Sequence, residues 1–230
     1  PRAGSRATTY KTGTARPPNV SGVNEHTSPE FSRSALLTID LQRDFVADIA
    51  GTAEVLPAVR RLTHAFRRAG RPIVHIVRLY LPDGSNADLC RRTVRGKVNP
   101  HSPGSRLADG LAPETELDPD LLLAGHAQEI GPNEHILYKP RWSAFFRTRL
   151  LDHLTEREVS TVVVAGCNYP NCPRATLVDA TERDLRTVAV RDALSRWTSD
   201  ADGELTGMGI ACLDTSEVIA AIRSRMAPSS

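Results

Sequence analysis

The stretch of sequence that decides the fold is Thr161-Val-Val-Val-Ala-Gly166-Cys-Asn-Tyr-Pro-Asn-Cys172-Pro-Arg-Ala-Thr176. Its apolar, β-branched first part predicts a buried β-strand that ends at Gly166. A short loop leads from there to Cys172, where the pattern indicates the start of a helix. A strand, a loop and a helix in this order form the repeating unit of an α/β protein.

Cys172 is placed for chemistry at the start of this predicted helix. Asn171 is suited to the N-cap, and Pro173 to the first helical position, where a missing N–H costs nothing. A thiol at a helix N-terminus feels the positive end of the helix dipole and unpaired N–H groups, which favour the thiolate. The same N–H groups could hold an oxyanion. The alternative interpretation is a buried, inert cysteine that follows a strand.

Two further predicted strands end in charged residues. The stretch Ser34-Ala-Leu-Leu-Thr-Ile-Asp40 ends in a carboxylate, and the strand that starts at Glu134 ends in Lys139. Taken singly, such an aspartate is a turn residue and such a lysine is a solvated edge charge. Ligands of an open parallel sheet bind outside the carboxyl ends of its strands. We therefore expect Asp40, Lys139 and Cys172 to meet at one site.

These segments resemble the isochorismatase-like cysteine hydrolases, which include nicotinamidases, N-carbamoylsarcosine amidase and ureidoacrylate amidase. The resemblance covers about residues 34 to 222 and implies a three-layer α/β/α sandwich with a mainly parallel central sheet. The residues that carry it are Thr38-Ile-Asp40-Leu-Gln-Arg-Asp-Phe45, Lys139-Pro-Arg-Trp-Ser-Ala-Phe-Phe146, and Gly166 to Cys172 with the Ala-Thr and Asp179-Ala that follow.

The resemblance implies a catalytic triad and an oxyanion hole. Asp40 would be the general base that takes the thiol proton, Lys139 would hold that carboxylate and stabilise the thiolate, and Cys172 would form an acyl-enzyme. The backbone N–H groups of Asn168 and Cys172 would hold the oxyanion. The peptide bond between Cys167 and Asn168 would be cis, as in relatives.

The substrate is less well determined by the sequence. Arginines favour an anionic or carbonyl-rich small molecule, and aromatic rings could stack on a ring or a cation. Arg141 and Trp142 have a competing interpretation as surface or core residues. We expect a cysteine-dependent hydrolase that cleaves an amide, carbamoyl or lactam C–N bond of a small molecule. Within this class, a ureido or carbamoyl amidase and a hydrolase that opens the lactam of a streptothricin-like antibiotic both stay open. The alternative to an enzyme is a non-catalytic binding or scaffold protein. The candidate substrate-binding residues are Phe45, Arg78, Tyr80, Arg141, Trp142 and Tyr169.

No metal or other cofactor is predicted. Nicotinamidases carry an Asp-x-His motif and a later histidine, whereas the residues after Phe45 read Val-Ala-Asp-Ile-Ala-Gly-Thr52, without a histidine. Cys167 and Cys172 lack partner ligands, so a zinc site is weakly supported. His75 is expected in the core. Loop or surface positions are expected for His101, His126, His135 and His153.

Composition narrows the class of protein. The chain has 230 residues, a net charge of +2 and four unevenly spaced cysteines. These values predict one α/β domain with reduced thiols in the cytoplasm, and they give no indication of nucleic-acid or membrane binding. Residues 1–32 are rich in Arg, Thr, Ser, Gly and Pro and predict an extended arm, with the hydrolase domain at residues 33–230. Relatives commonly form dimers or tetramers, so we expect a homo-oligomer to which the arm contributes.

Hydrophobic periodicity predicts the remaining elements. A long loop that could wall the site is expected over residues 81–119. Helices are expected at 52–69, 144–155, 172–183 and 215–225, and strands at 71–78, 135–139, 160–165, 185–191 and 210–213.

Overall fold

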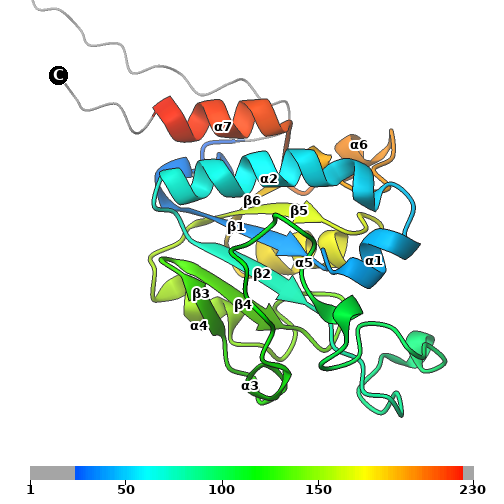
Figure 1. The fold of residues 1–230 in the computed structure, drawn as a ribbon. Coiled ribbons are helices and arrows are strands. Elements are labelled where there is room, and N and C mark those ends of the chain that lie inside the picture. The colour runs from blue at the N-terminus through cyan, green and yellow to red at the C-terminus, as the bar shows by residue number, and fades with distance from the viewer. Residues whose placement is uncertain (1–23, 225–230) are drawn as a thin grey trace, which may run out of the picture.

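The computed structural model describes residues 24–224 and has a seven-stranded sheet between two layers of helices (Figure 1). The strand order is β3-β4-β2-β1-β5-β6-β7, and every neighbouring pair is parallel except β3 with β4. The predicted three-layer α/β/α fold is thus confirmed. The strands are β1 (Ser34–Ile39), β2 (Ile73–Val77), β3 (Gln128–Gly131), β4 (Glu134–Tyr138), β5 (Thr161–Gly166), β6 (Arg186–Leu194) and β7 (Ala211–Leu213).

Helices cover both faces of the sheet, which is why the central strands are apolar along their whole length. One apolar cluster joins the sheet to α2 and α7, and a second joins its other face to α4, α5 and α6. Figure 1 shows α2 and α7 side by side on one face. The helices are α1 (Arg43–Asp48), α2 (Thr52–Arg68), α3 (Pro119–Leu123), α4 (Leu150–Thr155), α5 (Cys172–Thr181), α6 (Ala201–Thr206) and α7 (Thr215–Ser224). No helix within residues 24–224 is both long and apolar enough to cross a membrane.

The order of the strands locates the site. The chain runs from β1 through β2 to β4 on one side, and then returns to add β5, β6 and β7 on the other side. The direction of winding therefore reverses between β1 and β5. A crevice for a ligand forms outside the carboxyl ends of the strands at such a point.

Several elements differ from the sequence-based expectation. The helix predicted at 144–155 begins only at Leu150, because the preceding residues are held by side chains of α5, for example the Ala144 N–H by Thr176 Oγ1 at 3.0 Å. The antiparallel edge strand β3 was not predicted, since its residues are partly exposed and lack an apolar alternation. The long loop at 81–119 contains two short 3-10 helices, Leu89–Arg91 and Pro103–Ser105.

The last residues of the predicted arm form hydrogen bonds with the amino-terminal end of β5. The Glu30 N–H donates to Thr161 Oγ1 at 2.9 Å, and Ser160 Oγ donates to Glu30 Oε2 at 2.7 Å. Phe31 is buried in the apolar cluster beneath α2 and α7. The first 23 residues of the predicted arm lie outside the described residues.

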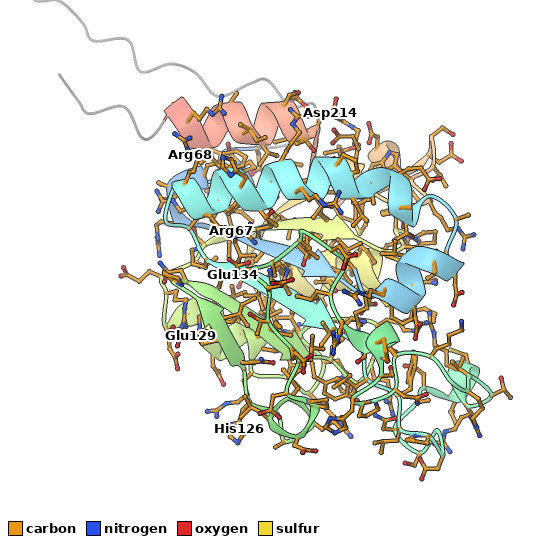
Figure 2. The ribbon with its side chains drawn as sticks, in the orientation of Figure 1. Arg67, Arg68, His126, Glu129, Glu134 and Asp214 are labelled. Carbon is orange, nitrogen blue, oxygen red and sulfur yellow. The ribbon has the colours of Figure 1, made fainter. Side chains whose placement is uncertain are left out.

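A buried polar network crosses the sheet at His75, which confirms the core position expected for this residue. His75 Nδ1 lies 2.7 Å from Thr38 Oγ1 on β1, and its Nε2 lies 2.8 Å from Glu134 Oε1 on β4. Arg67 of α2 donates to both oxygens of Glu134 at 2.7 and 2.6 Å, and the two side chains point toward each other in Figure 2.

The surface positions expected for two other histidines are wrong. His135 and His153 are both buried, and their rings meet edge to face with centroids 4.5 Å apart. His135 follows the first residue of β4 and His153 lies on α4, so strand and helix packing buries them together.

Candidate active site

Asp40 follows β1 directly and turns the chain out of the sheet. Its N–H still donates to Ile76 O at 2.9 Å, and its φ of 53° lies in the left-handed region that aspartate tolerates better than most residues. The side chain is buried. The carboxylate therefore lies at the carboxyl end of the sheet, in a fixed position.

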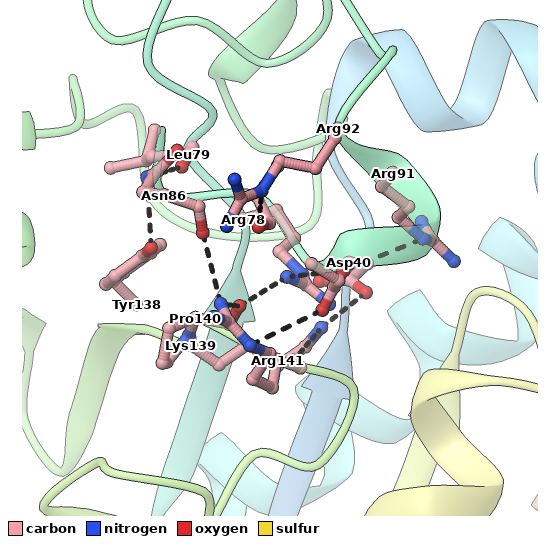
Figure 3. Close-up of polar contacts among 12 residues, drawn as sticks. Asp40, Arg78, Leu79, Asn86, Arg91, Arg92, Tyr138, Lys139, Pro140 and Arg141 are labelled. Atoms are coloured by element: carbon pink, nitrogen blue, oxygen red, sulfur yellow. Dashed lines mark hydrogen bonds and ion pairs between the residues drawn. The ribbon is translucent and has the colours of Figure 1, made fainter. Parts of the chain in front are cut away.

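Lys139 follows β4 and reaches across β2 to this carboxylate. Its N–H donates to Val77 O at 3.0 Å, and its Nζ donates to Asp40 Oδ2 at 2.8 Å (Figure 3). The lysine is 0% exposed, so its charge is balanced by a desolvated partner. Two charges held in this way are costly to separate, which fixes the orientation of the carboxylate.

The turn after β5 requires glycine. Gly166 has a φ of 123°, and a Cβ at this position would lie 2.3 Å from Ile39 O at the end of β1. The next N–H, that of Cys167, donates to the same Ile39 O at 2.8 Å. This close approach brings the loop after β5 to Asp40.

Cys172 is the first residue of α5, and Pro173 is the second. The Cys172 side chain is 3% exposed, and the helix continues above it with Thr176 Oγ1 donating to Cys172 O at 2.8 Å. Asn171 occupies the N-cap position, but its side chain makes no capping hydrogen bond.

The pKa of the Cys172 thiol is raised above its ordinary value. Burial is the largest cause and the Asp40 carboxylate the next, and together they outweigh the opposing effect of Lys139 and Arg78. The expectation that the helix N-terminus favours a resting thiolate is therefore not met. Asp40 Oδ1 is buried and accepts no hydrogen bond within residues 24–224, so an acceptor for the thiol proton is available.

The two N–H groups expected to hold an oxyanion remain available in the described part of the chain. Neither the Asn168 N–H nor the Cys172 N–H donates to a backbone oxygen or a side chain there, whereas the Tyr169 N–H between them donates to Ser195 O at 2.8 Å. The expected cis peptide bond before Asn168 is not present among residues 24–224, and the positive φ of Gly166 reverses the chain instead.

Arginines surround the buried ion pair. Arg78 follows β2 and therefore lies between Lys139 and Asp40 in the order of the strands. The Asp88 carboxylate, on the loop after β2, forms ion pairs with Arg78 at 3.4 Å, Arg91 at 3.8 Å and Arg141 at 3.9 Å. The predicted residues Arg78 and Arg141 are thus brought together by a carboxylate that was not predicted.

The aromatic candidates lie in three different places. Tyr80 packs beneath Arg78, whose Cζ is 5.6 Å from the ring centre, and it shares an apolar cluster with Phe45 of α1. Tyr169 is buried on the other face of the sheet, against Trp197. Trp142 is more than one-third exposed and lines a separate depression of about 380 Å³ along α5.

The site residues do not fit a divalent metal ion. No cluster of three or more His, Cys, Asp and Glu side chains within residues 24–224 is arranged to hold one. The charges of Lys139 and Arg78 act on Asp40, and cations repel a further cation.

Sequence patterns could not identify Asp88 and Arg91, because both lie in the long loop, where no periodicity indicates a position. The only available signal was the density of charge in the stretch Asp83 to Arg95. Asp44 holds this loop to α1, since its Oδ2 accepts from the Val98 N–H at 2.6 Å. Val98 itself has a φ of 43°, which a β-branched residue rarely adopts.

Comparison with known proteins places the chain in a family. The isochorismatase domain model matches residues 34–215. The probable inactive nicotinamidase of Arabidopsis thaliana is 30% identical over 170 residues, which are 70% of this chain and 79% of the relative. The ureidoacrylate amidohydrolase of Methylobacterium radiotolerans is 26% identical over 175 residues, 69% of this chain and 65% of the relative.

A solved structure agrees with these matches. The isochorismatase family protein of Desulfovibrio vulgaris superposes with a TM-score of 0.69 and 30% identity, over 83% of this chain and 98% of the other. The fold, the matched domain and the amidohydrolase relatives lead to the same conclusion. The chain belongs to the isochorismatase family and is a hydrolase of the class that acts on C–N bonds other than peptide bonds.

Proposed function

We propose that this protein is a cysteine-dependent hydrolase that cleaves an amide or carbamoyl C–N bond of a small molecule through an acyl-enzyme. One observation carries the proposal. A buried Asp40 carboxylate, fixed by Lys139 at 2.8 Å, keeps its second oxygen available beside the buried Cys172 thiol. A thiol with a raised pKa needs such a base before it can act as a nucleophile.

The reaction would proceed in two halves. Asp40 takes the thiol proton as the sulfur of Cys172 attacks the carbonyl carbon, and the N–H groups of Asn168 and Cys172 stabilise the oxyanion. The C–N bond then breaks, and the proton on Asp40 passes to the leaving nitrogen. Asp40 next takes a proton from water, which attacks the thioester, and returns it to the sulfur as the acid product leaves.

The named relatives favour amide or carbamoyl substrates over lactams. The relatives with named activities are amidohydrolases, one for ureidoacrylate and one, from Pseudomonas putida, for maleamate. Nicotinamide is less well supported, since the residues after Phe45 lack the Asp-x-His motif with which nicotinamidases hold a metal beside the pocket. Lactam opening and a non-catalytic binding role remain the alternatives that the experiment below separates.

The test is a panel of primary amides, carbamoyl compounds and lactams, assayed for released ammonia or for ring opening. Cys172→Ala should retain less than about a hundredth of the wild-type activity, because it loses the covalent route. Cys167→Ala is the matched control, since Cys167 is a buried thiol that lies near Thr52 and Ser195. Equal activity in Cys172→Ala and Cys167→Ala would contradict a cysteine nucleophile, and binding without turnover by the wild type would favour the non-catalytic role.

Activity should not depend on a divalent metal. We expect dialysis against a strong chelator to leave kcat/KM within about twofold of its starting value, as none of the proposed steps uses Lewis-acid chemistry. Elemental analysis of the dialysed protein is the accompanying measurement. A stoichiometric metal whose removal abolishes turnover, and whose return restores it, would show that the metal-free mechanism is wrong.

A further inference from the structure

Arg78 presents an unused hydrogen-bonding edge inside the protein. Its side chain is 1% exposed, and its Nη1 donates to Pro140 O at 2.8 Å and lies 3.4 Å from Asp88. Its other two nitrogens, Nε and Nη2, are buried and have no hydrogen-bond partner within residues 24–224. A buried donor without a partner loses its hydration and gains no hydrogen bond in exchange.

The two unpartnered nitrogens have a defined geometry. Nε and Nη2 lie along one side of the planar guanidinium, so their N–H bonds are parallel. A carboxylate, with two oxygens in one plane, matches this edge with two parallel hydrogen bonds. A single carbonyl oxygen or a neutral apolar group would leave at least one donor unpaired.

Arg78 lies among the proposed reacting groups. Arg78 follows β2, and it lies between Lys139 after β4 and Asp40 after β1. The charge of Arg78 acts on Cys172, and Asp40 is the strongest charged neighbour of Arg78. A ligand group held at Arg78 would thus be part of the same small molecule that Cys172 attacks.

The local charge also favours an anion. Lys139, Arg78, Arg91 and Arg141 are gathered around the two carboxylates of Asp40 and Asp88 (Figure 3). Cations therefore outnumber carboxylates at the carboxyl ends of β1, β2 and β4. An anionic group on the substrate would balance this excess, and the low exposure of Arg78 and Lys139 strengthens the attraction.

We propose that Arg78 binds a carboxylate of the substrate through Nε and Nη2, so that the substrate is a small amide or carbamoyl compound that also carries an acid group. The assignment of a reacting C–N bond to that molecule rests on the function proposed above. The competing view is that Arg78 only holds the loop after β2 in place through Pro140 and Asp88. The experiment separates these roles, because loss of a purely structural contact would impair acidic and neutral substrates alike.

The probes are two pairs that differ in the acid group, succinamic acid with butanamide and N-carbamoylglycine with N-ethylurea. The wild type should prefer the acid of at least one pair by about 100-fold or more in kcat/KM, because the neutral analogue leaves a buried edge unpaired. Arg78→Gln should reduce this preference at least about tenfold, mainly through KM for the acid. The preference of Arg78→Lys for the acid should lie between those of the wild type and Arg78→Gln, since lysine keeps the charge but loses the planar pair of donors.

The control is Arg61→Gln, which removes an exposed arginine of α2 and should leave the preference unchanged. If Arg78→Gln does not fold, the proposal is still tested by the preference of the wild type for the acidic probes and by the change of that preference in Arg78→Lys. Equal kcat/KM for acidic and neutral members, or an unchanged preference in Arg78→Lys and Arg78→Gln, would overturn the proposal.

A binding measurement keeps the proposal testable apart from the hydrolytic function. With Cys172→Ala protein, calorimetry should show succinamic acid or N-carbamoylglycine binding at least about tenfold more tightly than its neutral partner, and Arg78→Gln in the same background should remove the difference. This result without wild-type turnover of the probes would retain the carboxylate site and count against the proposed cysteine-dependent reaction. Turnover without any preference in rate or binding would retain the hydrolase and reject the carboxylate site.

Discussion

Cys172 is subject to opposing influences that decide how it can react. Burial and the Asp40 carboxylate raise the pKa of the thiol, while Lys139 and Arg78 lower it to a smaller extent. The resting group is therefore a thiol, and its activation depends on transfer of the proton to Asp40. The same carboxylate that hinders ionisation of the thiol in the resting protein is thus the base that the reaction uses.

Two substitutions should consequently have opposite effects on ionisation of the thiol. Asp40→Asn removes a charge that raises the pKa of Cys172, so we expect faster alkylation of Cys172 by iodoacetamide at pH 7. Turnover should nevertheless fall by about 10²–10⁴, because the general base is lost. Lys139→Met should raise the pKa further and slow alkylation. Peptide mass mapping checks both, with the exposed Cys90 as the internal reference.

Slower alkylation in Asp40→Asn would contradict this account, since it would mean that the carboxylate promotes the resting thiolate. Equal rates for Cys172 in the wild type, Asp40→Asn and Lys139→Met would show that neither charge acts on the sulfur. Circular dichroism of each variant is needed beside the labelling, because both substitutions leave one member of a buried ion pair without its partner.

The positions of the three proposed triad residues could be predicted from local patterns, because Asp40 and Lys139 directly follow apolar strands and Cys172 begins the helix after the next one. The protonation state of Cys172 could not, since it depends on burial and on a carboxylate more than a hundred residues away in sequence. Asp88 could not be predicted either. Its role arises only when the loop after β2 folds back over Arg78 and Arg141.

The elements bring the site together through the order of the strands. Across β4, β2, β1 and β5, the residues at or beyond the carboxyl ends are in turn Lys139, Arg78, Asp40 and Cys172. Parallel neighbours place these ends at one edge of the sheet, so the four side chains converge although they come from distant segments. Helix α1 adds the hydrogen bond from the Val98 N–H to Asp44, which holds the loop that carries Asp88 and Arg91.

Glu134 links three elements, because it binds His75 of β2 and Arg67 of α2 from its own position on β4. Burial alone would raise the pKa of this carboxyl, but the hydrogen bonds and charges of Arg67 and His75 prevail and lower it to about 2. We expect Glu134→Gln to lower the free energy of unfolding by about 3 kcal/mol at pH 7, as for removal of one member of a buried pair.

The pH dependence follows from the direction of the shift. A carboxyl whose pKa is about 2 in the folded state and 4.5 ordinarily contributes stability above about pH 4.5, and loses it as the pH falls toward 2. The difference between wild type and Glu134→Gln should therefore be constant from pH 5 to 7 and shrink below about pH 4.5. Denaturant unfolding at several pH values measures it. Glu129→Gln, at an exposed glutamate of β3 in Figure 2, is the control and should change little.

Periodicity predicted the long helix at 52–69 well, because seven of its residues are buried on one face. It failed at 144–149, where side chains of α5 hold the backbone in a non-helical path. Strand β3 was missed because its pairing with β4 comes from the turn at Asn133, whose φ is 57°, and not from a buried face. Local pattern thus identified elements with an apolar face, and it missed features set by a turn at Asn133 and by the hydrogen bond from Ala144 to α5.

At the scale of the whole molecule, the assembly and the location of the protein stay predictions. We propose a homo-oligomer, a dimer or tetramer, in the cytoplasm, to which the basic arm of residues 1–32 contributes. Within the described residues, the arm meets its own domain through Phe31 in the apolar cluster and through Glu30, which also lies 3.7 Å from Arg186. These contacts divide the arm into a segment that the structure ties to the domain and a preceding segment that it does not describe.

Two truncations should therefore have different effects. Removal of residues 1–32 deletes Phe31 and Glu30, together with the hydrogen bonds to Thr161 and Ser160. We expect a lower Tm, because loss of the buried aromatic ring alone lowers the free energy of unfolding by about 3–5 kcal/mol.

Removal of residues 1–23 keeps these contacts and should leave the Tm of the domain nearly unchanged. If the arm joins subunits, this shorter truncation lowers the mass measured by light scattering at matched protein concentration. Equal mass and equal kcat/KM in the full chain and in the chain that starts at residue 24 would show that the first 23 residues serve neither assembly nor the site. A fall in Tm on removal of residues 1–23 would instead mean that these residues stabilise the domain, either within the subunit or through an interface whose loss lowers the mass as well.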